Sequence, residues 1–343
     1  MSFSKKLRIR ALAALGLLLN GVLIFAVVAW FVLTRDAGPR FEERYGELSG
    51  AERESAAEGE GFVTERWRLT STSGLRCEMA VRTPTSAVEA ASAVDAEPRP
   101  LVLILGGHRT GRDAVELLPP DDRFVVAALS YPYHGPAKPK GLEVATALPA
   151  IRGALLDAPP CLRLTLDHLL PRPSVDSGRV EMLGVSLGAP LAVITGALDE
   201  RISRVWSIHG GGDLPAMLAF NLPEEVQNPF LGPPAKFVGG TLLAQLQPEL
   251  YAAEVAPRPL VMINAEDDER IPRSCVASLY AAAREPKELL WVEGEHVGPR
   301  RQQVLTELLR LVLPRIAAGV EGGPQASSSL ASPSPEALSS AAP

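Results

Sequence analysis

One stretch of the sequence, residues 179–194, constrains the fold more than any other. It reads as a short apolar strand, then Gly184-Val185-Ser186-Leu187-Gly188, then the start of a helix. A turn this tight strains the serine backbone, and its two glycines leave room for a close crossing of strand and helix. Ser186 would then sit at a helix N-terminus, where free N–H groups favour a developing oxyanion. The stretch predicts a nucleophilic serine on an α/β scaffold; the alternative is a small-residue turn with a bystander serine.

The sequence around this stretch alternates apolar strands with helices. Such alternation predicts an α/β fold with a mostly parallel, doubly wound sheet and helices on both faces. Two further segments with alternating apolar and polar residues, 62–71 and 75–83, predict a hairpin at the sheet edge, and residues 213–256 predict a small cap insertion. The predicted strands are 101–105, 124–129, 202–208, 260–264 and 288–292, and the predicted helices lie near 112–119, 144–170 (with proline breaks) and 301–316.

A serine hydroxyl is a poor nucleophile unless a base takes its proton, and His296 is the best-placed base. It is the only one of five histidines that follows the last predicted strand, in a short loop. The base needs a carboxylate, for which Asp268 in the loop after strand 260–264 is the first choice and Asp267 the second. In a mostly parallel sheet, loops after the strands meet at one edge, so these residues are expected to converge on Ser186.

An oxyanion formed at Ser186 needs two N–H donors. The Leu187 N–H directly follows the serine and is predicted to be one. The loop after strand 101–105 is predicted to give the other, from His108 with Gly107 as the alternative. Two further residues are candidates for substrate binding: Arg109 beside this loop, and His209 at the start of the turn into the cap.

Here the sequence resembles the α/β-hydrolase superfamily over roughly residues 62–318. The resemblance is carried by Leu-Gly-Gly-His at 105–108, Gly-Val-Ser-Leu-Gly at 184–188, Glu-Asp-Asp-Glu-Arg-Ile-Pro at 266–272 and Gly-Glu-His at 294–296. It resembles the esterase and dienelactone-hydrolase-like branch more than any peptidase, since it has no propeller-sized segment. The resemblance implies a Ser186–Asp268–His296 triad, an acyl-enzyme intermediate, and no cofactor or metal.

The two ends of the chain read differently from the middle. Residues 11–33 are apolar apart from Asn20 and follow four basic residues, which predicts an uncleaved membrane anchor within residues 1–34; a cleaved signal peptide is the alternative. The short tail before it favours a cytoplasmic N-terminus with the catalytic domain on the outer side. Residues 35–61 are predicted to be a tether, and residues 319–343, rich in Ala, Ser and Pro, a disordered tail.

The net charge and the cysteine content exclude some classes of function and limit the disulfides that the chain can form. The net charge of −6 and the lack of a basic cluster argue against nucleic-acid binding. Cys77, Cys161 and Cys275 are widely spaced and are predicted to be buried free thiols, although one bridge could form outside the membrane. The resulting hypothesis is a membrane-anchored serine hydrolase of carboxylic esters. The alternatives are an inactive hydrolase-fold binding module and, on the 106–111 loop, a nucleotide-binding domain, although that loop lacks the required second glycine.

Overall fold

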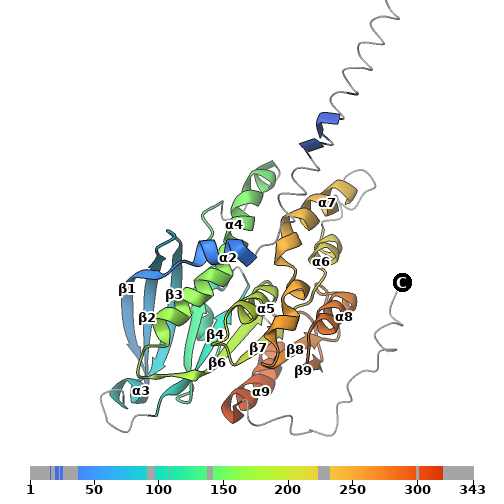
Figure 1. The fold of residues 1–343 in the computed structure, drawn as a ribbon. Helices are drawn as coiled ribbons and strands as arrows, with labels where there is room; N and C mark the ends of the chain where they lie inside the picture. Colours follow the sequence, from blue (N-terminus) through green and yellow to red (C-terminus); the bar gives the residue numbers. More distant parts are fainter. Residues whose placement is uncertain are drawn as a thin grey trace, which may run out of the picture.

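The computed structural model describes residues 38–90, 97–107, 109–136, 142–222, 232–298 and 301–319, together with 16, 20–22 and 24–25. Within these residues nine strands form one sheet in the order β1-β2-β3-β5-β4-β6-β7-β8-β9 (Figure 1). Strands β4 to β9 are parallel, and β1, β2 and β3 pair antiparallel. The strands are β1 (Leu48–Gly59), β2 (Phe62–Ser71), β3 (Arg76–Pro84), β4 (Arg99–Leu105), β5 (Val125–Leu129), β6 (Val175–Val185), β7 (Arg204–Ile208), β8 (Leu260–Ala265) and β9 (Lys287–Val292).

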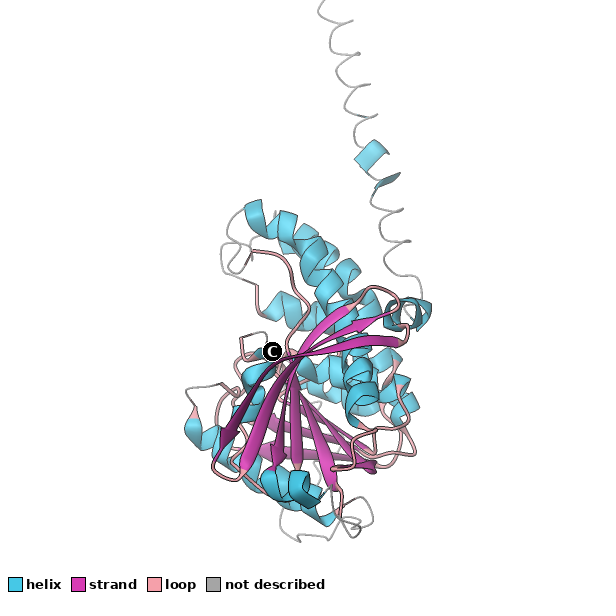
Figure 2. Cartoon of the chain, turned by 90° about the vertical axis from the view of Figure 1, so that its left-hand side faces the viewer, coloured by secondary structure: helices cyan, strands magenta, loops and turns pink. Residues whose placement is uncertain are grey.

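Helices cover both faces of the sheet, which confirms the predicted doubly wound arrangement (Figures 1 and 2). One apolar core joins the sheet to α4, α5 and α8, and a second joins its other face to η1 and α9. Strands β5, β7 and β8 are buried along their whole length, as their continuous apolar sequences predict. These helices are η1 (Gly111–Glu116), α4 (Leu142–Leu169), α5 (Gly188–Leu198), α8 (Arg273–Ala282) and α9 (Gln302–Ala318), with α2 (Gly38–Tyr45) and α3 (Thr85–Ala90) at the antiparallel end.

The predicted proline breaks between residues 144 and 170 do not occur. Helix α4 is continuous although Pro149, Pro159 and Pro160 lie inside it. A proline in a helix interior costs roughly 3 kcal/mol or more, so packing must offset it here. Leu156, Leu162 and other side chains of α4 are fully buried against the sheet. Tertiary contacts thus override the local sequence signal.

The folded domain begins earlier than residue 62, where the sequence predicted it to start. Residues 35–61, predicted to be a tether, contain helix α2 and the edge strand β1, which pairs with β2 along its whole length. Strand β1 is exposed except at its first residue and has no apolar alternation, which is why its sequence did not predict a strand. Phe41 of α2 is fully buried in the core. Residues 38–61 are therefore part of the domain.

A disulfide joins Cys77 of β3 to Cys161 of α4, with a Cα–Cα distance of 5.6 Å. The prediction of three free thiols was therefore wrong for this pair. The two cysteines are 84 residues apart, and only the packing of α4 across the hairpin brings them together. Cys275 is free and buried, as predicted.

The predicted terminal segments fall largely outside the described part of the chain. Of the predicted membrane anchor at 11–33, only residues 16, 20–22 and 24–25 are described, and the predicted tail is described only at Gly319. Within the residues that are described, no helix combines the length and the apolar character needed to cross a membrane.

Candidate active site

Ser186 sits on a strained turn between β6 and α5. Its φ is +56°, a left-handed value that side chains other than glycine rarely adopt. Both flanking glycines are required by space. A Cβ on Gly184 would lie 2.5 Å from the Cβ of Ala192, and one on Gly188 would lie 1.9 Å from the Leu105 carbonyl oxygen. The turn has the backbone form that the sequence predicted for this serine.

Three predicted residues meet at the carboxyl ends of the parallel strands. Ser186 Oγ lies 2.8 Å from His296 Nε2. His296 Nδ1 lies 3.0 and 2.9 Å from the two carboxylate oxygens of Asp268. The three side chains come from the β6–α5 turn and from the loops after β8 and β9. This arrangement links a hydroxyl, an imidazole and a carboxylate in one hydrogen-bonded row, which is what a serine nucleophile needs.

Asp268, rather than Asp267, lies beside the imidazole. The side chain of Asp268 is 3% exposed, and its Oδ1 accepts the backbone N–H groups of Arg270 and Ile271 at 2.8 and 2.9 Å. Burial opposes its ionisation, but hydrogen bonds from the neighbouring imidazoles and the Arg270 N–H outweigh burial and lower the pKa of Asp268. Asp267 is exposed. The buried carboxylate therefore stays charged opposite His296.

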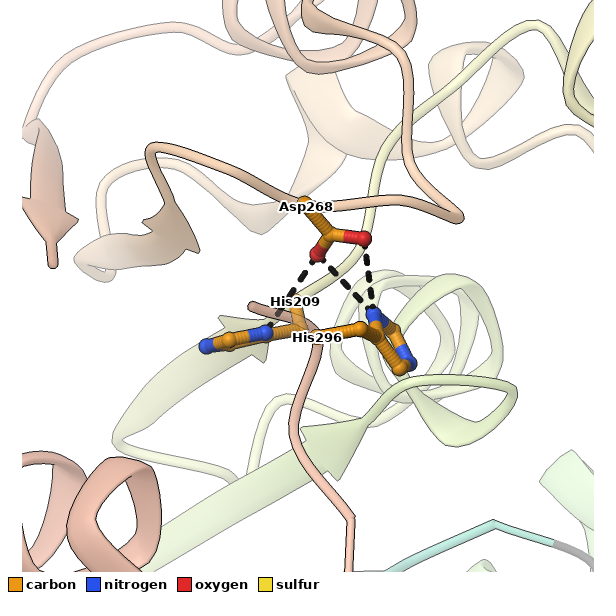
Figure 3. A group of neighbouring side chains, drawn as sticks. All are labelled: His209, Asp268 and His296. Atoms are coloured by element: carbon orange, nitrogen blue, oxygen red, sulfur yellow. Dashed lines mark hydrogen bonds and ion pairs between the residues drawn. The ribbon is translucent and has the colours of Figure 1, made fainter. Parts of the chain in front are cut away.

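His209 lies beside His296 at the Asp268 carboxylate (Figure 3) and is not among the residues that line the cavity, whereas the sequence predicted it as a substrate-binding residue. Its side chain is fully buried, and burial lowers its pKa. Nδ1 of His209 is 3.3 Å from Asp268 Oδ2 and 3.0 Å from the Val297 N–H donor. A neutral imidazole nitrogen is either a donor or an acceptor. Nδ1 of His209 therefore donates to Asp268 when it carries the proton and accepts from the Val297 N–H when it does not.

His209, Asp268 and His296 also have the composition of a metal site. One potential ligand atom from each lies within 4.8 Å of the others (Figure 3). Nδ1 of His296 is, however, directed to both oxygens of Asp268, and its Nε2 faces Ser186. These hydrogen bonds account for the donor and acceptor atoms of His296 without an ion. The geometry fits an acid–base relay better than a metal centre.

Two residues that the sequence did not single out hold the His296 loop. Glu269 accepts the His296 backbone N–H at 2.9 Å, and Arg301 pairs with Glu269 at 2.7 Å. Arg301 also donates to the His296 carbonyl oxygen at 2.5 Å. The sequence shows the acidic run that contains Asp268. It does not show that Asp268 contacts the imidazole of His296 while Glu269 binds the backbone of the His296 loop.

The predicted oxyanion loop lies against the start of α5. The carbonyl oxygens of Leu105 and Gly106 lie so close to Gly188 that only glycine fits there. The Tyr131 hydroxyl donates to the Gly106 carbonyl at 2.9 Å and fixes the loop from the neighbouring strand end. Gly107 follows directly. His108 lies outside the described residues, so only the Leu187 and Gly107 parts of the predicted hole are placed.

The two arginines beside this loop do not lie in the cavity. Arg109 is exposed, and no contact of its side chain with another described residue is found. Arg112 pairs with Glu54 of β1 at 2.5 Å and lies 3.7 Å from Glu78. The charge of Arg112 is thus balanced within the domain. The structure shows no contact that supports the predicted role of Arg109 in substrate binding.

A cavity of about 310 Å³ opens beside Ser186 and His296. Its cap-side wall comes from the insertion between β7 and β8, which contains α6 (Leu214–Phe220), α7 (Gly232–Leu243), η2 (Ala244–Leu246), η3 (Pro248–Leu250) and η4 (Ala252–Val255). The predicted cap at 213–256 thus lies over the site. The apolar residues lining the cavity are Leu155, Leu187, Pro190, Leu191, Leu214, Met217, Leu218, Leu243, Leu246 and Ile271, and Asn221 and Arg270 add polar atoms.

No protein-family model and no curated protein matches the sequence. Solved structures do match the fold. Acetyl xylan esterase 1 from Thermoanaerobacterium sp. JW/SL YS485 gives a TM-score of 0.56 at 16% identity, covering 82% of this chain and 92% of that one. Acetyl xylan esterase from Paenibacillus sp. R4 gives a TM-score of 0.56 at 15% identity, covering 80% of this chain and 91% of that one. Methylesterase BT1017 gives a TM-score of 0.51 at 16% identity, covering 84% of this chain and 63% of that one. With its parallel sheet, serine turn and cap, the chain has the α/β-hydrolase fold predicted from its sequence.

Proposed function

We propose that this protein is a serine hydrolase of carboxylic esters. The observation that carries the proposal is the hydrogen-bonded row from Ser186 Oγ through His296 to Asp268. The similarity in fold to acetyl xylan esterases and a methylesterase supports ester bonds as the substrate class. An inactive binding module would have no need of a serine held in a strained conformation against an imidazole.

In the proposed reaction, Ser186 Oγ attacks the ester carbonyl carbon while His296 Nε2 takes the hydroxyl proton. Asp268 orients the ring through Nδ1 and stabilises the imidazolium. The Leu187 N–H and an N–H of the Gly107–His108 segment would stabilise the oxyanion. When the tetrahedral intermediate collapses, His296 returns the proton to the leaving alcohol. Water then attacks the acyl-enzyme with the same base, which releases the acid and restores Ser186.

The cavity walls favour an apolar acyl group. Most residues that line it are aliphatic, and the polar atoms cluster at Ser186, His296, Asn221 and Arg270. Burial of an apolar chain contributes about 0.8 kcal/mol for each methylene group, so a volume of about 310 Å³ favours acyl chains longer than acetyl. We expect kcat/KM to rise along a series of esters from acetyl to octanoyl.

Labelling with a fluorophosphonate probe tests the reaction class. The wild-type chain should be labelled, and Ser186→Ala should remove both the labelling and the hydrolysis of p-nitrophenyl esters. Ser203→Ala is a matched control, because Ser203 lies just before β7, at the opposite end of that strand from the site, where its hydroxyl forms hydrogen bonds with Gly178 and Val180 of β6. Labelling that persists in Ser186→Ala would contradict the assignment of the nucleophile.

The placement of the protein is part of the proposal. Residues 11–33 are proposed to anchor the chain in a membrane with the hydrolase domain on the outer side. The Cys77–Cys161 disulfide supports that side, since structural disulfides persist in oxidising compartments. Flotation of the full chain with lipid vesicles, retained after a wash in high salt or carbonate, tests the anchor.

A further inference from the structure

The outer side of the cap carries large apolar side chains that face solvent. Phe220 at the end of α6 is 55% exposed, and Phe237 and Val238 of α7 are 51% and 45% exposed. Helices α6 and α7 lie together, since Gly239 fits closely against the side chain of Leu218. We call Phe220, Phe237 and Val238 the outer cap residues. They are three of the six large apolar side chains that are exposed in the described part of residues 38–319.

The same two helices are apolar on their inner side as well. Leu214, Met217 and Leu218 of α6 and Leu243 of α7 line the substrate cavity. The sequence of α6 contains no charged residue, and that of α7 contains only Lys236. A helix that is apolar on all sides is normally buried. We therefore expect the outer cap residues to pack against an apolar partner.

The chain enters the domain next to this cap. Helix α2 starts at Gly38, and Arg40 donates to Gln245 of η2 at 3.4 Å. The ring of Phe41 contacts Tyr251 edge-on, with 6.1 Å between the ring centres. Both partners belong to the insertion that forms the cap. The first turn of α2 is thus fixed to the cap, close to the end of α7 (Figure 1).

The length of chain before α2 limits how far this region can lie from a membrane. Only residues 34–37 separate the proposed span, 11–33, from Gly38. Four extended residues reach at most about 14 Å. Wherever the span ends, α2 and the cap bound to it must lie close to the same bilayer surface.

We infer that the outer cap residues rest in the interfacial region of the bilayer, so that the cavity takes its ester substrate from the lipid phase. The inference rests on the proposed function and its membrane anchor. It gives the apolar outer face of the cap a partner. It also gives an apolar acyl chain a route from the membrane, past the cap, to Ser186. A second copy of the chain covering the same face is the competing arrangement.

An environment-sensitive probe on the cap tests the contact. The full chain carrying Phe237→Cys, labelled with the fluorophore NBD, would be placed in vesicles of phosphatidylcholine and phosphatidylglycerol. Cys275 is fully buried, and burial raises its thiol pKa to about 11, so it should not take the label. The matched control is Val88→Cys, which is 44% exposed on α3 at the other end of the molecule (Figure 1).

Nitroxide-bearing lipids should quench the probe at residue 237 strongly and the probe at residue 88 weakly, while iodide in water should do the reverse. Equal iodide quenching at both positions would overturn the inference. Protection from iodide without quenching by lipid nitroxide, rising with protein concentration, would indicate a second copy and would also overturn it. Chains that fail to float with the vesicles would instead remove the anchor on which the inference rests.

Activity separates this inference from the proposed chemistry. The double variant Phe220→Ser/Phe237→Ser should hydrolyse a long-chain ester in vesicles at least about tenfold more slowly than wild type, because two aromatic side chains no longer bury in the interface. Its rate on water-soluble p-nitrophenyl acetate should stay within about twofold of wild type, since neither residue lines the cavity. Equal losses on both substrates would contradict docking. A wild-type chain inactive on both substrates would contradict the hydrolase proposal itself.

Discussion

His209 Nδ1 lies 3.3 Å from Asp268 Oδ2, the same carboxylate oxygen that His296 Nδ1 approaches at 2.9 Å (Figure 3). The rings of His209 and His296 meet edge-on, with 5.4 Å between their centres. The same nitrogen of His209 faces the Val297 N–H, in the residue after His296. His209 therefore contacts both the carboxylate and the loop that carries the base, without reaching the cavity. We interpret it as a positioning residue.

Replacement of His209 by alanine should lower kcat about tenfold with little change in KM, because loss of its Nδ1 leaves a buried polar partner unsatisfied and loosens Asp268 and His296. His209→Asn places a polar atom near the position of Nδ1 and should recover most of the rate. Steady-state kinetics on a soluble ester measure both effects. Equal kcat losses in the two variants, accompanied by equal losses in melting temperature, would indicate a purely structural role.

Asp268→Asn should lower kcat by about four orders of magnitude, because the imidazole loses the carboxylate that fixes its tautomer. Asp267→Asn removes the adjacent, exposed carboxylate and should leave kcat near wild type. Both variants remove one negative charge, so a difference in kcat between them reports the position of the carboxylate relative to His296. A strong loss in Asp267→Asn with a weak one in Asp268→Asn would reverse the assignment.

The lowered pKa of Asp268 predicts a pH-dependent contribution to stability. A carboxyl group whose pKa is lower in the folded than in the unfolded state stabilises the fold above its unfolded value of about 3.9. That contribution is lost as the pH falls through the folded value. The difference in unfolding free energy between wild type and Asp268→Asn should therefore shift against wild type as the pH falls below about 4. Urea unfolding at each pH measures it, and a difference unchanged under acid would contradict the prediction.

The disulfide predicts a simple count of thiols. After denaturation without reductant, alkylation should modify one cysteine, Cys275, and after reduction it should modify all three. Cys77→Ala/Cys161→Ala should reduce the free energy of unfolding by about 2–4 kcal/mol, since the bridge closes a long loop in the unfolded chain. Mass spectrometry and urea unfolding provide the measurements. Three modified cysteines in unreduced protein from the oxidising side of a membrane would contradict the bridge.

Met217→Trp should narrow the cavity from the cap side. We expect kcat/KM for an octanoyl ester to fall about tenfold or more, because overpacking a filled apolar site costs about 1–3 kcal/mol, while the acetyl ester keeps its rate. Leu250→Trp enlarges an exposed residue of the same insertion that does not line the cavity, and it should change neither rate. Parallel losses on acetyl and octanoyl esters would contradict the assignment of this wall to the acyl chain.

The sequence predicted the parts of this structure whose signals are local. The buried strands and the Ser186 turn follow from continuous apolar runs and from glycine spacing, and the meeting of Ser186, Asp268 and His296 follows from parallel strand order. Strand β1 was missed because its partner, β2, rather than its own pattern, makes it a strand. The Cys77–Cys161 bridge was missed because it depends on how α4 crosses the hairpin. The position of His209 depends on a buried carboxylate that no local pattern marks.

The insertion over the active site departs from β7 and returns at β8, and these two strands are neighbours in the sheet. It therefore occupies the place of an ordinary crossover, with both attachment points at adjacent strands of a rigid frame. Ser186, Asp268 and His296 all lie outside it. Leu246, Ala252 and Val255 of the insertion pack into the core, so the part that can vary while the proposed reacting groups stay in register is the outer one, around α6 and α7. Grafting a different insertion between these strands offers a direct route to altering the range of esters accepted.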